Sequence, residues 1–285
     1  MTRYRPARAA PLVVRWTVGN VSRQGFEALR WSLLGASQLF DAAARYVVCV
    51  NTVPARTAAA LVGSLPVDVE WLPVSSAEMP AFIRDRLDAN LAEGVGWKFA
   101  PFRIDQNAFE LSLDNDCILW EMPDAVRQWL DHGARPLIAE DVRACFGQFG
   151  ERCGSAPRNS GIRGLPPRWP FEEDVQDVLE LAGRPLASET DEQGLQVAAI
   201  TLRTAPFLVR TTDVTICSPF RPHQPYVADA GATSSESIRS RSRGPTTAGP
   251  ALEVLHDHWR RLRATLAARI DDPARVSAPP RPSSA

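Results

Sequence analysis

Lysine is almost absent from this chain of 285 residues: of its 32 lysine and arginine residues, only Lys98 is a lysine. The use of arginine nearly everywhere is typical of a GC-rich genome and requires no physical explanation. The single ammonium group is still a candidate for a specific contact, because it is a compact point charge that suits a phosphate. The alternative is an ordinary solvated lysine on a helix.

The sequence also lacks a surplus of charge of either sign. Its 33 acidic residues nearly balance the basic ones, and the formal net charge is -1. Proteins that bind nucleic acid neutralise its phosphates with clustered positive charge. Nucleic acid is therefore disfavoured as a partner.

Long apolar runs are missing as well. No segment approaches the roughly 20 apolar residues that cross a bilayer, and the N-terminal residues contain no apolar run of signal-peptide length. We therefore expect no transmembrane segment and a cytoplasmic location. Five cysteines are present, but none form a Cys-x-x-Cys pair, so neither a zinc knuckle nor a disulfide framework is indicated and free thiols are expected.

What the chain does contain is an alternation of short apolar runs with helical segments. Strands are predicted at PLVVRWTVGN, RYVVCVN, PVDVEWLPV and FELSLDNDCIL, and later at PFLVR and TDVTICS. Helices are predicted at 22–40 with Ser22 as N-cap, in PARTAAALVGS, and at 78–92, 97–104, 171–182 and 188–203. This alternation is typical of an α/β fold with a mostly parallel central sheet flanked by helices.

The C-terminal part differs in composition from the rest. Residues 229–249 are poor in apolar side chains and rich in Ser, Gly and Arg, so we expect a disordered or poorly packed insert after a domain that spans 1–228. Residues 250–272 form a strongly amphipathic pattern that predicts a helix docked on the domain. The Pro- and Ser-rich segment 273–285 is expected to be a disordered tail.

Polar residues follow several of the predicted strands. Asp114, Asn115 and Asp116 come after an apolar run, and Asn20 and Asn51 close two earlier strands. Ligands of open parallel sheets bind outside the carboxyl ends of the strands. Two carboxylates one residue apart can offer oxygen ligands to a hard divalent cation, which in turn can hold a diphosphate. The alternative for Asp-x-Asp is a solvated turn stabilised by an Asx hydrogen bond.

Six segments in this order resemble a known family. They are WTVGN, RYVVCVN, GWKFAPFRI, FELSLDNDCILWEMP, RNSGIRGLPP and TDEQGLQVAA, which together span roughly residues 12–220. The chain resembles bacterial nucleotide-diphospho-sugar transferases of the GT-A fold, related to the glycogenin-like family eight. The resemblance implies a single Rossmann-like GT-A domain that transfers a sugar from a nucleotide-sugar donor, expected to be a UDP-sugar, to an unknown acceptor.

The resemblance also implies roles for individual residues. Asp114 and Asp116 match the metal-binding Asp-x-Asp, which is expected to hold Mn²⁺ or Mg²⁺ against the donor diphosphate. Asp191 and Gln193 match a segment near the transferred sugar and are the expected catalytic residues. Donor-binding positions are implied at Trp16, Thr17, Asn20, Asn51, Lys98, Asn115, Asn159, Gly161 and Glu192.

Simpler explanations stand beside these assignments. Asn20 and Asn51 are also common residues at the ends of strands, and Gly161 also serves where the backbone needs freedom. Asp191 and Glu192 also suit the first turn of a helix, where carboxylates complement the macrodipole and Ser188 or Thr190 supplies the cap. In that case neither carboxylate takes part in chemistry.

The chain departs from the family at one place. A His-x-x-Gly segment with a further metal-ligating histidine is expected near residue 232, where this sequence reads GATSSESIR. Reverse translation of this stretch with a one-base offset yields His-Phe-Val-Gly-Ile-Asn, so we hypothesise a compensated frameshift across about 232–248. His223 is a weaker substitute ligand. Without the histidine, the alternative function is a catalytically impaired domain that binds a nucleotide-sugar or a partner.

Overall fold

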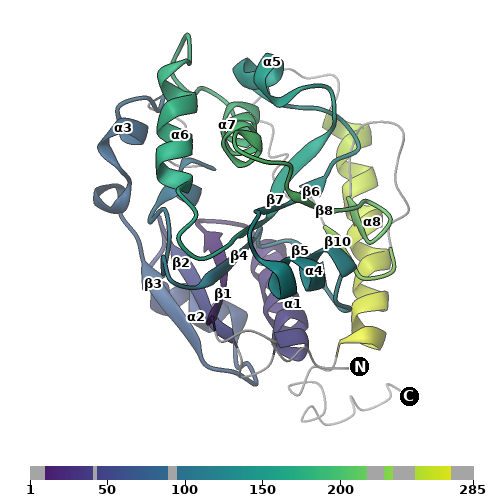
Figure 1. The fold of residues 1–285 in the computed structure, drawn as a ribbon. Coiled ribbons are helices and arrows are strands. Elements are labelled where there is room, and N and C mark those ends of the chain that lie inside the picture. Colours follow the sequence, from purple (N-terminus) through teal and green to yellow (C-terminus); the bar gives the residue numbers. More distant parts are fainter. Residues whose placement is uncertain (1–9, 41–43, 89–94, 217–227, 234–247, 271–285) are drawn as a thin grey trace, which may run out of the picture.

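The computed structural model describes residues 10–40, 44–88, 95–216, 228–233 and 248–270, and all structural statements below concern these ranges (Figure 1). The chain begins with two β-α-β units. Strand β1 (Leu12–Val18), helix α1 (Arg23–Phe40), strand β2 (Ala44–Val50), helix α2 (Ala55–Val62) and strand β3 (Val69–Pro73) follow one another as predicted. The Ser22 hydroxyl accepts a hydrogen bond from the Gly25 amide and caps α1, also as predicted.

The segment after β3 contains less helix than expected. Among its described residues, which leave out 89–94, only a 3₁₀ helix η2 (Ser76–Glu78), the single turn α3 (Ala81–Arg84) and a 3₁₀ helix η3 (Val95–Phe99) form. The predicted helix at 97–104 is therefore wrong beyond its first turn. Pro101 is the reason, because its ring fixes φ and its nitrogen cannot donate a helical hydrogen bond. Residues 89–92 of the other predicted helix lie outside the described ranges.

The remaining elements complete the α/β pattern. Asp114 to Asp116 form the turn between β4 (Phe109–Leu113) and β5 (Cys117–Leu119). The elements that follow are α4 (Asp124–His132), β6 (Leu137–Glu140), η4 (Gly147–Phe149), α5 (Gly150–Cys153), β7 (Arg158–Leu165), α6 (Phe171–Glu180), α7 (Glu189–Thr201), β8 (Phe207–Val209), β9 (Val214–Ile216), β10 (Gly231–Thr233) and α8 (Ala248–Arg269).

Seven strands form the central sheet in the order β3-β2-β1-β4-β7-β6-β8. All neighbours are parallel except at β7, which runs antiparallel to both β4 and β6. The sheet is therefore mostly parallel, which confirms the predicted fold class. Because β7 is reversed, its first residues lie at the same edge of the sheet as the last residues of β1, β2 and β4.

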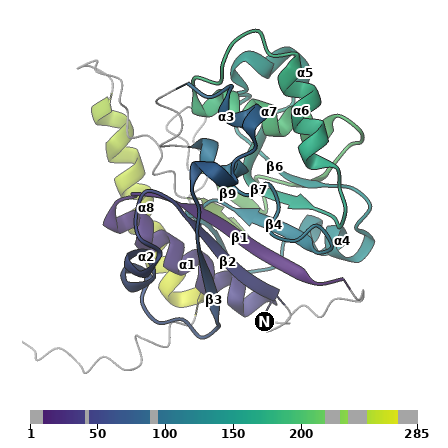
Figure 2. The same cartoon turned by 90° about the vertical axis from the view of Figure 1, so that its left-hand side faces the viewer.

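Helices cover both faces of the sheet (Figure 2). On one face, α1, α2 and α4 pack against alternate residues of the strands, such as Val14, Trp16 and Leu111. On the other face, α6 and α7 pack with η3 and α3 around Ile138 and Leu165. Successive strand residues point to opposite faces, so Trp16 faces α1 while Arg15 and Thr17 face η3.

Helix α8 packs on the outer side of α1, as the amphipathic pattern predicted. Trp259, Leu262, Leu266 and Ile270 are buried against Trp31 and neighbouring residues of α1 and β5. The expectation of an unpacked segment at 229–249 is wrong for its first residues, because strand β10 pairs with both β5 and β9 and buries Ala232. Residues 234–247, and with them most of the hypothesised frameshift, lie outside the described ranges, as does the predicted tail at 273–285.

Candidate functional site

A lysine and two carboxylates meet where β4 ends. The Lys98 ammonium lies 2.8 Å from Oδ1 and 3.1 Å from Oδ2 of Asp114, and 3.9 Å from Oε2 of Glu192. The three groups come from η3, the end of β4 and the first turn of α7. Asp114 is the most accessible, with 34% of its side chain exposed, followed by Lys98 at 21% and Glu192 at 2%. The cluster therefore opens to solvent on the Asp114 side.

Burial and mutual charge shift the pKa values of this cluster. Burial alone would lower the pKa of Lys98, but the carboxylates of Asp114 and Glu192 outweigh it, so the pKa is raised and the ammonium stays charged. Burial raises the pKa of Glu192 to about 7, an effect that Lys98 opposes and Asp114 reinforces. At neutral pH Glu192 is thus close to the midpoint of its titration, whereas Lys98 is fully protonated.

Two residues of β7 complete this edge of the sheet. The Asp114 amide donates to the Gly161 carbonyl at 2.8 Å, and the Gly161 amide donates to Oδ1 of Asn159 at 2.6 Å. A Cβ at Gly161 would lie 2.7 Å from Oδ1 of Asn159 and 3.1 Å from Oδ2 of Asp114. Residue 161 therefore has to be glycine for the two side chains to lie as they do. The structure brings together Lys98, Asp114, Asn159, Gly161 and Glu192, all five implied by the resemblance.

Asn115 and Asp116 occupy the turn after Asp114. The Asn115 side chain donates to the Gly25 carbonyl at the start of α1, at 3.4 Å. Asp116 is half-buried. Burial raises the pKa of the Cys117 thiol well above its usual range, and the charges of Asp116 and Asp114 raise it further. Both carboxylates therefore lie near this thiol, at the same turn.

The turn after β4 carries carboxylate oxygens, which are the type of ligand that hard divalent cations take. Within the described residues, no group of three or more His, Cys, Asp or Glu side chains is arranged to hold a metal ion. Mg²⁺ and similar hard cations are commonly bound by one or two carboxylates together with substrate phosphates. Asp114 and Asp116 each carry a carboxylate of this type. His223, the weaker candidate ligand, lies outside the described ranges.

The ends of β1 and β2 form a neighbouring polar group at the same edge. The Asn20 amide donates to the Thr52 hydroxyl at 2.9 Å, and that hydroxyl lies 3.1 Å from Oδ1 of Asn51. A Cβ at Gly19 would lie 2.5 Å from the same Asn51 oxygen, so glycine is needed there. Asn51 is buried, Thr17 half-buried and Asn20 exposed. These positions stay candidates for donor contacts.

Trp16 does not reach this edge. Its side chain is 0% exposed and its indole N–H donates to the Ser32 hydroxyl of α1 at 2.8 Å. The indole is therefore part of the core beneath α1, and a nucleotide base has no access to it. The reason is the alternation of the strand, which turns Trp16 and Thr17 to opposite faces of the sheet.

The carboxylate of Asp191 is held by hydrogen bonds from other residues of the protein. Its two carboxylate oxygens accept hydrogen bonds from the Gln148 and Ala187 amides and from the Arg184 guanidinium, and the side chain is fully buried. Burial alone would raise the pKa of Asp191, but these donors outweigh it and the pKa is lowered. The Ser188 hydroxyl accepts a hydrogen bond from the Asp191 amide and caps α7, which is the role that the simpler explanation gives it.

The structure leaves no free acceptor on Asp191 for a substrate, and we remove it from the candidate site. Gln193, the other expected catalytic residue, is half-buried and donates to the Cys145 carbonyl at 3.1 Å. Glu192, between the two, is the residue of this segment that faces Lys98.

Several neighbours of the cluster were not predicted from the sequence. Gln196 lies one turn after Glu192 and donates to its Oε1, while its own Oε1 accepts from Arg163. Oδ2 of Asp141 accepts a hydrogen bond from the side-chain amide of Asn159 at 3.0 Å. The spacing of Glu192 and Gln196 on one helix face is a signal that the sequence did offer. The contact of Asp141 depends on the pairing of β6 with β7 and leaves no local pattern.

Comparisons with known proteins bear on the fold. No protein-family model matches the chain, and no curated protein is significantly similar to it in sequence. Among solved structures, an active-site mutant of LgtC superposes with a TM-score of 0.52 at 12% identity, over 90% of this chain and 96% of that one.

Two further structures are less similar. The galactosyltransferase LgtC in complex with donor and acceptor sugar analogs gives a TM-score of 0.48 at 13% identity, covering 86% of this chain and 95% of that chain. The glycosyltransferase GlyE of Streptococcus pneumoniae gives 0.46 at 13% identity, with coverage of 90% and 64%.

In the part of the chain that the structure describes, none of the helices combines the length and apolar character needed to span a membrane. At so low an identity the likeness to the LgtC mutant establishes the fold alone. The chain has a GT-A-like glycosyltransferase fold.

Proposed function

We propose that this chain is a metal-dependent glycosyltransferase that moves a sugar from a nucleotide diphosphate to an acceptor hydroxyl. The observation that carries the proposal is the cluster of Lys98, Asp114 and Glu192 at the carboxyl edge of the sheet, which combines a cation for phosphate with carboxylates for a metal and a sugar. The GT-A-like fold supports the same conclusion, because ligands of such sheets bind at this edge.

The donor diphosphate is bound from two sides in this proposal. Asp114 and Asp116 would hold Mn²⁺ or Mg²⁺, which when bound would supply Lewis-acid stabilisation of the departing diphosphate. Lys98 contacts a phosphate oxygen as a point charge. Its raised pKa keeps it positive throughout the physiological range. Asn159 is held by Asp141 and by the Gly161 amide, and this arrangement fixes its side chain beside Asp114.

Glu192 is the residue that we assign to the transferred sugar. Its Oε1 is taken by Gln196, so Oε2, which faces Lys98, is the oxygen left for a substrate. In glycosyl transfer the sugar becomes oxocarbenium-like as its bond to the leaving group breaks, and a carboxylate nearby stabilises that positive charge. This role requires the ionised form of Glu192.

Thermal unfolding with a panel of nucleoside diphosphates tests the proposal. A ligand that binds the native state raises stability by RT ln(1 + [L]/Kd). We expect one of UDP, GDP, ADP, CDP or dTDP to raise the Tm of the wild type, more strongly with Mn²⁺ than without it. Asp114→Asn is expected to lose the Mn²⁺-dependent part of the shift.

The matched control is Glu70→Gln. Glu70 forms an exposed ion pair with Arg45 near the start of β2, at the opposite edge of the sheet, and its loss should leave the ligand shift intact. Absence of a shift with every nucleotide would refute the proposal. A shift without release of nucleotide from the matching sugar donor would instead favour a noncatalytic nucleotide-sugar-binding domain.

A further inference from the structure

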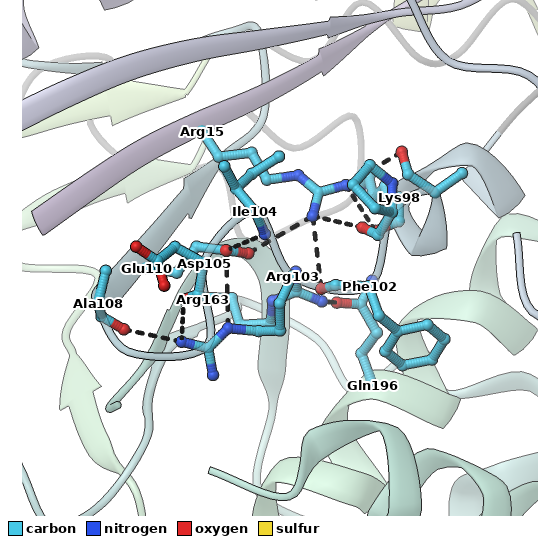
Figure 3. Close-up of polar contacts among 12 residues, drawn as sticks. Arg15, Lys98, Phe102, Arg103, Ile104, Asp105, Ala108, Glu110, Arg163 and Gln196 are labelled. Atoms are coloured by element: carbon cyan, nitrogen blue, oxygen red, sulfur yellow. Dashed lines mark hydrogen bonds and ion pairs between the residues drawn. The ribbon is translucent and has the colours of Figure 1, made fainter. Parts of the chain in front are cut away.

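Directly beneath the cluster lies a guanidinium that is completely enclosed by protein. Arg15 (Figure 3) is in the middle of β1, an interior strand of the seven-stranded sheet, and 0% of it is exposed. An isolated charge in such a place is very unfavourable, because water no longer solvates it. An ordinary core would hold an apolar side chain at this position, so a buried guanidinium here indicates a specific role.

The hydrogen bonds of Arg15 are concentrated on one short segment. Nη1 donates to the carbonyl oxygens of Pro101 at 2.6 Å and Phe102 at 3.4 Å, and Nη2 donates to those of Lys98 at 3.3 Å and Ala100 at 3.4 Å. These carbonyls belong to the last residues of η3 and the irregular backbone after it. A single side chain thus fixes the conformation of the turn from which the Lys98 side chain extends.

Glu110 ties the same guanidinium to the strand that carries Asp114. Its carboxylate is buried, with Oε1 3.4 Å from Nη1 of Arg15, while Oε2 accepts from the Ile104 amide at 2.7 Å. Glu110 lies on β4, four residues before Asp114. Strand β4 therefore carries Glu110, the partner of Arg15, and the turn directly after it carries Asp114, the partner of Lys98, so Arg15 links the two segments.

We propose that Arg15 is a positioning residue that sets the Lys98 ammonium against Asp114. It acts through the backbone of residues 98–102 and touches no substrate. Its importance for donor binding rests on the proposed function, whereas its effect on the Lys98 side chain does not. Arg163, which is also buried beneath the cluster, bonds instead to Gln196 on α7, so its contacts are with another element.

The single lysine allows a direct test. Acetylation by an N-hydroxysuccinimide ester requires access to the amine, so an ammonium that is partly buried and held in an ion pair with Asp114 reacts slowly. Peptide mass spectrometry of the acetylated protein follows Lys98, with the α-amino group of the chain as the internal reference. We expect Arg15→Gln to increase the relative rate at Lys98 at least threefold. Arg45→Gln, which removes an exposed guanidinium on β2, is expected to leave that rate unchanged.

A second variant covers the case in which Arg15→Gln does not fold. Arg15→Lys keeps a positive charge, but an ammonium lacks the fork that reaches four carbonyls, and the same increase at Lys98 is expected. Circular dichroism checks that each variant is folded. A folded variant with the wild-type rate at Lys98 would overturn the proposal, and so would failure of both variants to fold, which would make Arg15 a purely structural residue.

A double-mutant cycle then separates this proposal from the proposed function. If Arg15 acts through Lys98, UDP with Mn²⁺ should bind no more weakly to Arg15→Gln/Lys98→Met than to Lys98→Met alone. Additive losses of affinity would contradict the positioning role. If the wild type binds none of the nucleoside diphosphates, the proposed function fails, yet the acetylation rates still decide whether Arg15 positions Lys98.

Discussion

The carboxylate of Glu192 lies 3.9 Å from the ammonium of Lys98, and Asp114 holds the same ammonium at 2.8 Å. One positive charge is thus shared by two carboxylates that differ in burial. The Asp114 side chain is 34% exposed and can exchange the ammonium for a ligand, whereas the Glu192 side chain is only 2% exposed. In the proposed function, this difference separates a metal and phosphate side of the site from a sugar side.

The first prediction concerns the pH dependence of stability at Glu192. Its pKa is raised from 4.5 to about 7 in the fold, mainly by burial, so the protonated form is favoured in the native state. Its contribution to stability is full below pH about 4.5 and is lost as the pH rises through 7.

Glu192→Gln imitates the protonated acid and removes this dependence. The variant should match the wild type at pH 5 and exceed it by up to about 3 kcal/mol at pH 8.5. Urea unfolding across this range measures the difference, in which titrations common to both proteins cancel. Parallel stability curves of the two proteins would show that Glu192 is ionised in the fold at all these pH values.

The second prediction concerns Lys98. Lys98→Met keeps the length of the side chain but removes the ammonium, and a hydrogen bond to a charged group contributes about 1.5–3 kcal/mol. We expect the affinity for the nucleoside diphosphate to fall at least about tenfold, as measured by isothermal titration with Mn²⁺ present. Lys98→Arg should recover part of the loss. Equal affinities of Lys98→Met and wild type would place the phosphate elsewhere.

The arrangement of strands was largely predictable from the sequence, but the face of the sheet to which each side chain points was not. β1 and β2 are buried on both faces, so their apolar runs carry no alternation to tell which face a residue takes. Nothing in the strand pattern therefore opposes the placement of Trp16 at the ligand edge that the resemblance implies, although Trp16 faces α1, and nothing marks Arg15, which lies on the face of η3.

Helix α7 shows the same limit in another form. Consecutive helical residues point about 100° apart, so only the docking of α7 on the sheet decides that Glu192 meets Lys98 while Asp191 turns to Arg184. The sequence points to the segment that reaches Lys98, but tertiary packing decides which residue of that segment does so. Asp114 was found more easily, because the end of a strand fixes its location without reference to a distant element.

The third prediction separates the structural role of Asp191 from a catalytic one. Asp191→Asn replaces an acceptor with an N–H donor that points at other donors, and the expected loss is about 2–4 kcal/mol of unfolding free energy at pH 7. Because the pKa of Asp191 is lowered in the fold, its contribution is present above its ordinary pKa of 3.8 and disappears as the pH falls below it. The difference between wild type and variant should shrink accordingly in acid.

Asp124→Asn, at an exposed carboxylate in the first turn of α4, serves as the control and should change stability by less than about 0.5 kcal/mol. A catalytic Asp191 would give the opposite result: unchanged stability with a large loss of kcat.

The fourth prediction uses two glycines with contrasting surroundings. Gly161→Ala places a Cβ 2.7 Å from Oδ1 of Asn159 and 3.1 Å from Oδ2 of Asp114, so at least one of these side chains has to move. Gly150→Ala places a Cβ in open space, with no atom within 4 Å, on a residue with helical φ and ψ. We expect Gly161→Ala to weaken Mn²⁺-dependent nucleotide binding at least about tenfold, at a stability cost of about 1–3 kcal/mol for overpacking.

Gly150→Ala should bind as the wild type does and gain about 0.4–1 kcal/mol, because alanine restricts the unfolded chain and favours helix. The comparison separates a crowded site from a general effect of replacing glycine. Wild-type binding by Gly161→Ala would mean that neither Asn159 nor Asp114 needs its present position. The proposed metal and sugar-flanking roles both depend on those positions. The candidate site would then have to be moved away from the end of β4.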